Sequence, residues 1–373
     1  QCWGASDAEP LSVIDVDRHR PASAGLNESC LPEGGDGRAA GSCDLREKTA
    51  GKVAVRSLAP FRSSAGRLFA VVQSACMGPL EALFVRRRGN VEGSAPPIFL
   101  IGPPRSGSTL VTQVLTDAFR VGYMSNLHCR WYGWPGFAER AFGAMFNAAP
   151  SDYESSHGQT KGLRAPAECG AWWYRFFPVE PAYATRQDVS DLNLEAFARS
   201  LRDLEAAAGS PLIFKNLYAS LRIEPIVACF PDALFVVIER DEVSNAQSIL
   251  RARQKVHGCY EPWWSVPPPE VEELKNLKPV EQVVGQIRKI HGLINRDVTR
   301  LGLAGQVFRI NYERFCSDVH ETLGMFEEFA ATHGVALERR FDVPRRFPSV
   351  SHSELPASLL QELDSCVRGR VSD

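Results

Sequence analysis

The sequence predicts an α/β fold with three layers, in which a parallel central sheet carries helices on both faces. Short apolar runs rich in β-branched residues recur along the chain, each bounded by turn residues, and such runs are typical of buried parallel strands. Longer segments with helical periodicity separate them, and strands that alternate with helices form a parallel sheet. The composition, 44% hydrophobic and 23% charged, is that of an ordinary globular protein.

The expected elements follow one another from residue 97 onward. The expected strands span residues 97–101, 121–123, 212–214, 234–238 and 306–310. The expected helices span residues 108–119, 220–229, 242–254, 279–300 and 319–332. A further helical region is expected between the strand at 121–123 and about residue 208. These elements predict one α/β domain over residues 96–373.

Two segments precede this domain. Residues 1–60 are rich in small and polar residues without sustained periodicity, which predicts a disordered or variable extension. Residues 61–95 are predicted to form an amphipathic helical lead-in. The chain begins with Gln1 rather than Met, so the sequence leaves an upstream targeting segment open.

The apolar stretch Leu68–Val85, followed by Arg86–Arg88, raises the question of a membrane span. Gln73, Pro79 and Glu81 interrupt the stretch, and it barely reaches the length that a span needs. We therefore expect a helix packed on the domain, with membrane contact as the less favoured alternative.

Charge and cysteine usage exclude some classes of function. The net charge of −2 offers no basic surface for nucleic acid. The ten cysteines show neither a C-x-x-C motif nor zinc spacing, so no metal site is expected, and a reducing, cytoplasmic compartment is favoured. Cys30 and Cys43 are the pair that would form a disulfide if the chain were secreted.

The most informative segment is Pro97–Leu115, where an apolar run meets a Gly/Pro/Ser turn and then a helical pattern. A loop at the start of a helix aims backbone N–H groups at one point, where the helix dipole adds positive potential. Gly102, Gly107 and Thr109 fit the Walker A pattern, but Ser108 stands at the position of its lysine. The segment therefore predicts a phosphate-binding loop that differs from the loop of an ordinary kinase or ATPase.

A second phosphate anchor is predicted at the end of the apolar run Ala233–Ile238. Arg240 follows this expected strand, and Ser248 lies eight residues later on an expected helix. An arginine and a serine that converge from a strand end and a helix can bind one phosphate, and ligands of open α/β sheets gather at the carboxyl ends of strands.

These two segments resemble those of PAPS-dependent sulfotransferases, whose 5′-phosphosulfate loop follows the pattern P-[KR]-[SA]-G-[ST]-[ST] and whose 3′-phosphate site pairs an arginine with a serine eight residues later. Pro104–Thr109 and the text FPDALFVVIERDEVSNAQS match these patterns. The resemblance implies the P-loop-like sulfotransferase architecture, PAPS as sulfonate donor, PAP as product and no metal. It implies donor binding by Pro104, Arg105, Ser106, Gly107, Ser108, Thr109, Arg240, Ser248 and Tyr312.

Weaker matches accompany these motifs. Lys215, at the end of an expected strand, resembles the lysine that contacts the sulfonate or the bridging oxygen in the family. Tyr312, after the last expected strand, resembles the family's Y-E segment near the nucleotide. Arg345–Arg346 resembles a late basic segment that touches the 3′-phosphate. Arg105 and Lys215 are accordingly the residues expected to stabilise charge during transfer.

Three residues are candidates for the base that takes the acceptor proton. Leu217 stands where the cytosolic phenol and steroid branch has a histidine. Glu168 lies before a Trp-rich segment, in text similar to that of bacterial sulfotransferase-like proteins, and its burial against those rings would favour proton uptake. His128 and His157 are the alternatives.

Aromatic residues point to the acceptor. Six of the seven tryptophans form the pairs Trp131/Trp134, Trp172/Trp173 and Trp263/Trp264, and aromatic faces suit sugars and aromatic acceptors. The text after Trp264 contains Pro267–Pro269, which suggests a lid. We expect the sulfonate acceptor to be a hydroxyl group, or less favourably an amine, of a small molecule or a glycan. The alternatives are a kinase with a degenerate loop and a non-catalytic nucleotide-binding module, and the sequence leaves the oligomeric state open.

Overall fold

The structure is a computed structural model that describes residues 69, 72–88, 94–145, 149–154, 160–348 and 355–369. The predicted extension over residues 1–60, with Cys30 and Cys43, lies outside these described residues, as does His157. None of the seven cysteines that the structure describes is in a disulfide bond.

The centre of the described chain is a five-stranded sheet in the order β2-β3-β1-β4-β5, in which all neighbours are parallel. The strands are β1 (Ile98–Ile101), β2 (Gly122–Tyr123), β3 (Leu212–Lys215), β4 (Leu234–Glu239) and β5 (Val307–Asn311). The inner strands β1 and β3 are buried at every position, which explains why their sequences are continuously apolar. The predicted α/β class is confirmed.

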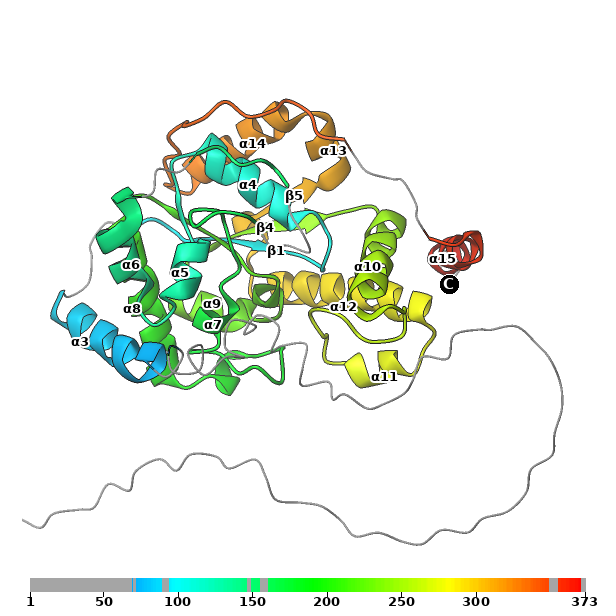
Figure 1. Ribbon diagram of the computed structural model, residues 1–373, viewed down its shortest axis with the longest axis horizontal. Helices are drawn as coiled ribbons and strands as arrows, with labels where there is room; N and C mark the ends of the chain where they lie inside the picture. The colour runs from blue at the N-terminus through cyan, green and yellow to red at the C-terminus, as the bar shows by residue number, and fades with distance from the viewer. Residues whose placement is uncertain are drawn as a thin grey trace, which may run out of the picture. The chain divides into compact units, whose positions relative to one another are not determined.

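Helices cover both faces of the sheet (Figure 1). The longer ones are α3 (Gly78–Arg88), α4 (Ser108–Ala118), α6 (Pro135–Phe142), α8 (Asp191–Ala208), α10 (Glu242–His257), α12 (Pro279–Arg300), α14 (Val319–Thr332) and α15 (Ala357–Arg368). The shorter ones are η2 (Gln73–Met77), α5 (Asn126–Arg130), η3 (Gly143–Met145), α7 (Gly170–Trp173), η4 (Arg186–Asp188), η5 (Leu217–Leu221), α9 (Ile223–Cys229), α11 (Val271–Lys275), η6 (Ala304–Gln306) and α13 (Tyr312–Ser317).

The expected elements from residue 97 onward are present within a few residues of their predicted bounds. Two differences stand out. The described part of the region between β2 and α8, expected to be helical, holds helices of at most 8 residues joined by loops. Helices α11, α13 and α15 have no counterpart among the predicted elements.

Each face of the sheet has its own apolar core. On one face the register aligns Phe99 of β1 with Phe214 of β3 and Phe235 of β4, and helices α7, α8, α9 and α12 cover them. On the other face Ile98, Leu100 and their neighbours pack against α4, α13 and α14. Figure 1 shows α4 and α14 on one side of the strands and α8 and α12 on the other.

Trp172 and Trp173 belong to the first of these cores. Both side chains are 0% exposed, and Trp172 stacks on Phe214 with ring centroids 5.7 Å apart. The expectation that an acceptor stacks on this pair is therefore wrong, because neither indole has a face open to a ligand.

Candidate active site

Four neighbouring strands deliver the predicted site residues to one edge of the sheet. Because β3, β1, β4 and β5 run parallel, their carboxyl ends meet at the same edge. Lys215 ends β3, the loop Gly102–Gly107 follows β1, Arg240 follows β4, and Tyr312 follows β5. Residues more than 200 positions apart in the chain thus belong to one site.

The loop after β1 ends at Gly107, which precedes α4 with a left-handed φ of 97°. A Cβ atom at this position would lie 2.1 Å from the ring of Tyr312, so only glycine fits both the conformation and the contact. The side-chain oxygen of Ser106 is buried and has no hydrogen-bond partner among the described residues. With the amides at the start of an eleven-residue helix, this hydroxyl forms a cradle suited to an anion.

Side chains from other elements hold the loop by its backbone carbonyl and amide groups. Asn245 Nδ2 donates to the Pro104 carbonyl at 2.7 Å, and Arg240 Nη1 donates to the Arg105 carbonyl at 2.9 Å. Ser220 Oγ accepts from the Gly102 amide at 2.9 Å. Sequence analysis did not single out Asn245 and Ser220, although Asn245 lies between Arg240 and Ser248 in the matched motif.

Arg105 joins the two predicted phosphate anchors. Its Nε donates to Ser248 Oγ at 3.0 Å, and its backbone has a left-handed φ of 64°. Burial, followed by the nearby guanidinium groups of Arg240 and Arg251, lowers the pKa of Arg105 below its usual value. The Tyr312 ring supports Arg240, whose Cζ lies 4.9 Å from the ring centroid. These guanidinium groups repel one another, and a bound anion would relieve that repulsion, so the site favours an anion.

Lys215 lies on the other side of the loop. Its side chain is 3% exposed, and its Nζ donates to Thr109 Oγ1 at 2.9 Å and pairs with Glu168 Oε1 at 2.9 Å. Asn216 Nδ2 holds the Glu168 carbonyl at 3.3 Å. Glu168 remains 36% exposed, so a carboxylate that faces solvent lies directly beside a buried ammonium group next to the phosphate-binding loop.

Two tyrosines that sequence analysis missed lie near this carboxylate. The rings of Tyr174 and Tyr218 pack edge to face with centroids 6.1 Å apart, and both phenols lie within electrostatic reach of Glu168. Burial raises the pKa of both phenols. The guanidinium of Arg222 packs behind them, 5.8 Å and 5.4 Å from the two ring centroids. No sequence motif marks these residues, because the fold alone brings η5 beside α7.

His128 occupies a structural position. Its side chain is 2% exposed, Nδ1 accepts from the Ser125 amide at 3.0 Å, and Nε2 lies 2.9 Å from Glu139 Oε2. Arg164 binds the same carboxylate at 2.6 Å. Both imidazole nitrogens are thus engaged, whereas Glu168 is the base candidate that the structure brings next to Lys215.

This buried network predicts a pH-dependent stability. Burial raises the pKa of Glu139, but the hydrogen bonds from His128 and Arg164 outweigh it and hold the pKa at about 2, below the ordinary value of 4.5. A carboxyl whose pKa is depressed on folding stabilises the protein above pH 4.5, and this stabilisation is lost as the pH falls toward 2. Over this window the wild type should lose on the order of 3 kcal/mol more unfolding free energy than Glu139→Gln. Chemical denaturation at several pH values measures the difference, and parallel pH curves for the two proteins would refute it.

The other two tryptophan pairs lie outside the cores of the sheet. Trp263 and Trp264 are half-buried, and Gln286 Nε2 holds the carbonyls of Trp264 and Val266 at 3.1 and 2.8 Å. The lid formed by this loop stays a prediction. Trp131 and Trp134 contact Phe137, away from the cores of the sheet.

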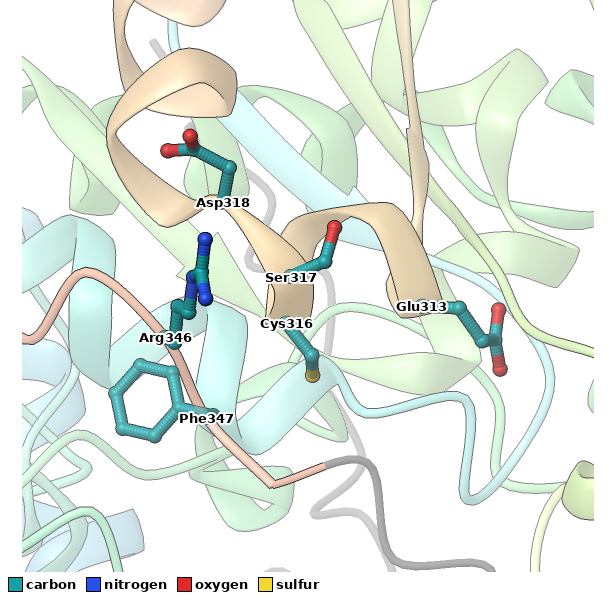
Figure 2. A pocket seen from close by; sticks show the side chains of 6 residues that line it. All are labelled: Glu313, Cys316, Ser317, Asp318, Arg346 and Phe347. Atoms are coloured by element: carbon teal, nitrogen blue, oxygen red, sulfur yellow. The ribbon is translucent and has the colours of Figure 1, made fainter.

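The late basic segment borders a pocket beside α13 (Figure 2). The pocket is lined by Glu313, Cys316, Ser317, Asp318, Arg346 and Phe347. Glu313 Oε1 accepts from the Asp241 amide at 3.2 Å, which ties this helix to the residue after Arg240. Arg345 instead pairs with Asp318 at 3.2 Å. Arg346 is thus the arginine of this pair that lines the pocket, on the β5 side of the site.

The described ranges have neither a metal-binding cluster nor a membrane-spanning helix. They contain no group of three or more His, Cys, Asp or Glu side chains placed to hold a metal ion. None of the helices described combines the length and the apolar character that crossing a bilayer requires.

Comparison with known proteins agrees with these features. A model described as the sulfotransferase family matches residues 96–332. Among solved structures, sulfotransferase STF9 from Mycobacterium avium aligns with a TM-score of 0.44 at 16% identity, over 79% of this chain and 73% of that chain. Sulfotransferase STF1 from Mycobacterium tuberculosis H37Rv aligns with a TM-score of 0.46 at 14% identity, over 77% of this chain and 83% of that chain. A sulfotransferase from Alicyclobacillus acidocaldarius aligns with a TM-score of 0.38 at 14% identity, over 73% of this chain and 91% of that chain. No curated protein sequence matches the chain.

Proposed function

Because the chain belongs to the sulfotransferase family, we propose that it transfers a sulfonate group from PAPS to the hydroxyl of an acceptor. The observation that carries this proposal is the direct contact between the two phosphate anchors, Arg105 Nε to Ser248 Oγ, with Lys215 and Glu168 on the other side of the same loop. The unpartnered Ser106 hydroxyl and the gathered guanidinium groups fit a donor that carries two phosphates.

Each residue of the site has a role in this scheme. The amides of the loop, with Ser106, Ser108 and Thr109, would hold the 5′-phosphate, and Arg240 and Ser248 the 3′-phosphate. PAPS, when bound, supplies the activated sulfonate. Lys215 would stabilise the charge that develops on the leaving phosphate oxygen, since a preorganised cation in a buried site favours such charge strongly. Glu168 would accept the proton of the attacking hydroxyl.

The acceptor side favours a neutral compound rich in hydroxyl groups, such as a carbohydrate or a glycosylated molecule. Tyr174 and Tyr218 contribute hydroxyl groups within electrostatic reach of Glu168, which fits such a ligand. A screen of sugars, glycosides, phenols and amines with sulfur-labelled PAPS tests the proposal. Labelled product supports it, whereas ATP- and Mg²⁺-dependent phosphorylation would favour the kinase, and PAP binding without any transfer would favour the non-catalytic module.

The 3′-phosphate site can be tested through ligand discrimination. We expect the wild type to bind 3′,5′-ADP (PAP) more tightly than AMP, and we expect Arg240→Ala and Ser248→Ala each to reduce this preference. Losing a hydrogen bond to a charged group costs about 1.5–3 kcal/mol, or roughly ten- to a hundredfold in affinity. Calorimetric titration with both nucleotides measures the effect. Equal affinity of the wild type for PAP and AMP would contradict the assignment.

Arg105→Ala should weaken PAP binding and also slow turnover. The side chain bridges the loop to Ser248, and its loss removes a cation from the centre of the proposed donor site. Affinity is expected to fall by about tenfold or more. A folded variant with wild-type affinity and kinetics would exclude the loop from donor binding.

A further inference from the structure

Three hydrogen bonds tie two consecutive residues of the phosphate-binding loop to the end of β4 and to α10. Asn245 Nδ2 donates to the Pro104 carbonyl at 2.7 Å, and Arg240 Nη1 donates to the Arg105 carbonyl at 2.9 Å. The side chain of Arg105 adds the third, from its Nε to Ser248 Oγ at 3.0 Å. The backbone of Arg105 is left-handed, with a φ of 64°, and a residue other than glycine keeps such a conformation only where its surroundings hold it. The shape of the loop therefore depends on these contacts.

Asn245 differs from the other two partners of the loop. Arg240 and Ser248 are assigned to the 3′-phosphate, so a bound nucleotide would share or replace their hydrogen bonds to the loop. Asn245 lies on α10 three residues before Ser248, on the same face of the helix, and its side chain is 0% exposed. Its hydrogen bond to Pro104 is the contact of the three that involves no group assigned to the donor.

The buried amide of Asn245 is only half satisfied. Its Oδ1 has no hydrogen-bond partner among the described residues, although buried polar atoms normally find one. An unpaired buried oxygen costs stability, and a leucine of similar size would carry no such atom. Stability alone therefore does not account for an asparagine here, whereas the contact of its Nδ2 with the loop does.

The geometry of the peptide group shows what this contact does to the loop. The peptide between Pro104 and Arg105 is trans, so its carbonyl oxygen and its N–H point in opposite directions. Because Asn245 holds the carbonyl, the N–H of Arg105 is turned away from Asn245 and cannot rotate freely. Without the contact, the peptide plane and the left-handed backbone of Arg105 would lose a restraint.

We propose that Asn245 is a positioning residue, which holds the Pro104–Arg105 peptide so that the loop is shaped for the 5′-phosphate before the donor binds. The inference rests on the proposed function, which gives the loop a phosphate to bind. The residue should then matter for every nucleotide with a 5′-phosphate, with or without a 3′-phosphate. Ser248 should differ, because its loss reduces only the preference for PAP over AMP.

Calorimetric titration of Asn245→Leu with PAP and with AMP tests this pattern. We expect the affinity for both nucleotides to fall by about tenfold, with the ratio of the two affinities near the wild-type value. Gln286→Leu is the matched control and should leave both affinities unchanged. Gln286 is also 0% exposed, its Oε1 is unpartnered among the described residues, and its Nε2 donates to backbone carbonyls of a different loop, those of Trp264 and Val266. Asn245→Ala is the second variant, since the smaller side chain cannot overlap its neighbours.

Hydrogen exchange in the ligand-free protein measures the loop directly. The peptide that covers residues 102–109 should exchange faster in Asn245→Leu than in the wild type and in Gln286→Leu, while the thermal unfolding midpoints report that each variant is folded. The proposal is overturned if the exchange of this peptide is unchanged, or if Asn245→Leu binds both nucleotides as the wild type does. A loss confined to PAP would also overturn it, because it would place Asn245 at the 3′-phosphate. A wild type that binds neither nucleotide overturns the proposed function instead, and the exchange of the ligand-free loop then decides the role of Asn245.

Discussion

Glu168→Gln is expected to lower kcat by about a hundredfold or more while the affinity for PAP stays near the wild-type value. The glutamine side chain has the same size, and its carbonyl oxygen can still accept a hydrogen bond from Lys215. The substitution therefore removes the proton acceptor and retains the local geometry. Transfer to the best acceptor of the screen, combined with calorimetric titration of PAP, measures both quantities.

Two histidine variants serve as comparisons for this prediction. His128→Asn should reduce stability, because it disrupts the buried contact with Glu139, but should leave kcat of the folded protein close to wild type. His157→Asn tests the third candidate. If Glu168→Gln turns over normally and one histidine variant is inactive, that histidine is the base.

The strand ends that build the site could be predicted because β1, β3 and β4 are continuous apolar runs and β5 has apolar residues at Phe308 and Ile310. Buried parallel strands require such runs, so Lys215, Arg240 and Tyr312 could be placed at the strand ends from the sequence. The order β2-β3-β1-β4-β5 and the contact between Arg105 and Ser248 could not, because they depend on tertiary packing across 143 residues.

The errors have a common physical origin. A tryptophan beside a candidate base can belong either to the core or to a binding site, and the sequence of α7 does not distinguish the two. The orientation of α3 is a similar case. The sequence predicts an amphipathic helix packed on the domain, but Glu81 is buried in an ion pair with Arg175, 94 residues away, while Leu80 and Leu83 are exposed. Tertiary contacts of this kind override local pattern.

Lys215→Met is expected to lower kcat by about a hundred- to a thousandfold, the range observed when one preorganised donor is removed from a site of charge development. Methionine fills the buried space of the lysine stem, so the sheet edge should stay packed. Glu168 is 36% exposed and can be hydrated once its partner is lost, which limits the cost in stability. The hydroxyl of Thr109 also loses a donor. Thr109→Val removes that contact together with one proposed phosphate ligand and keeps the ammonium group, so it should have the smaller effect on kcat.

A double-mutant cycle decides whether Lys215 and Glu168 act in the same step. Their side chains are 2.9 Å apart, so the two substitutions should not be independent. If the lysine stabilises the leaving oxygen in the same transition state in which the carboxylate takes the proton, the double variant should be about as slow as the slower single variant. Multiplicative losses would mean that the two residues act in separate steps. A folded Lys215→Met protein with wild-type kcat would remove the lysine from the mechanism, because a buried ammonium group at the phosphate-binding loop would then contribute only to structure.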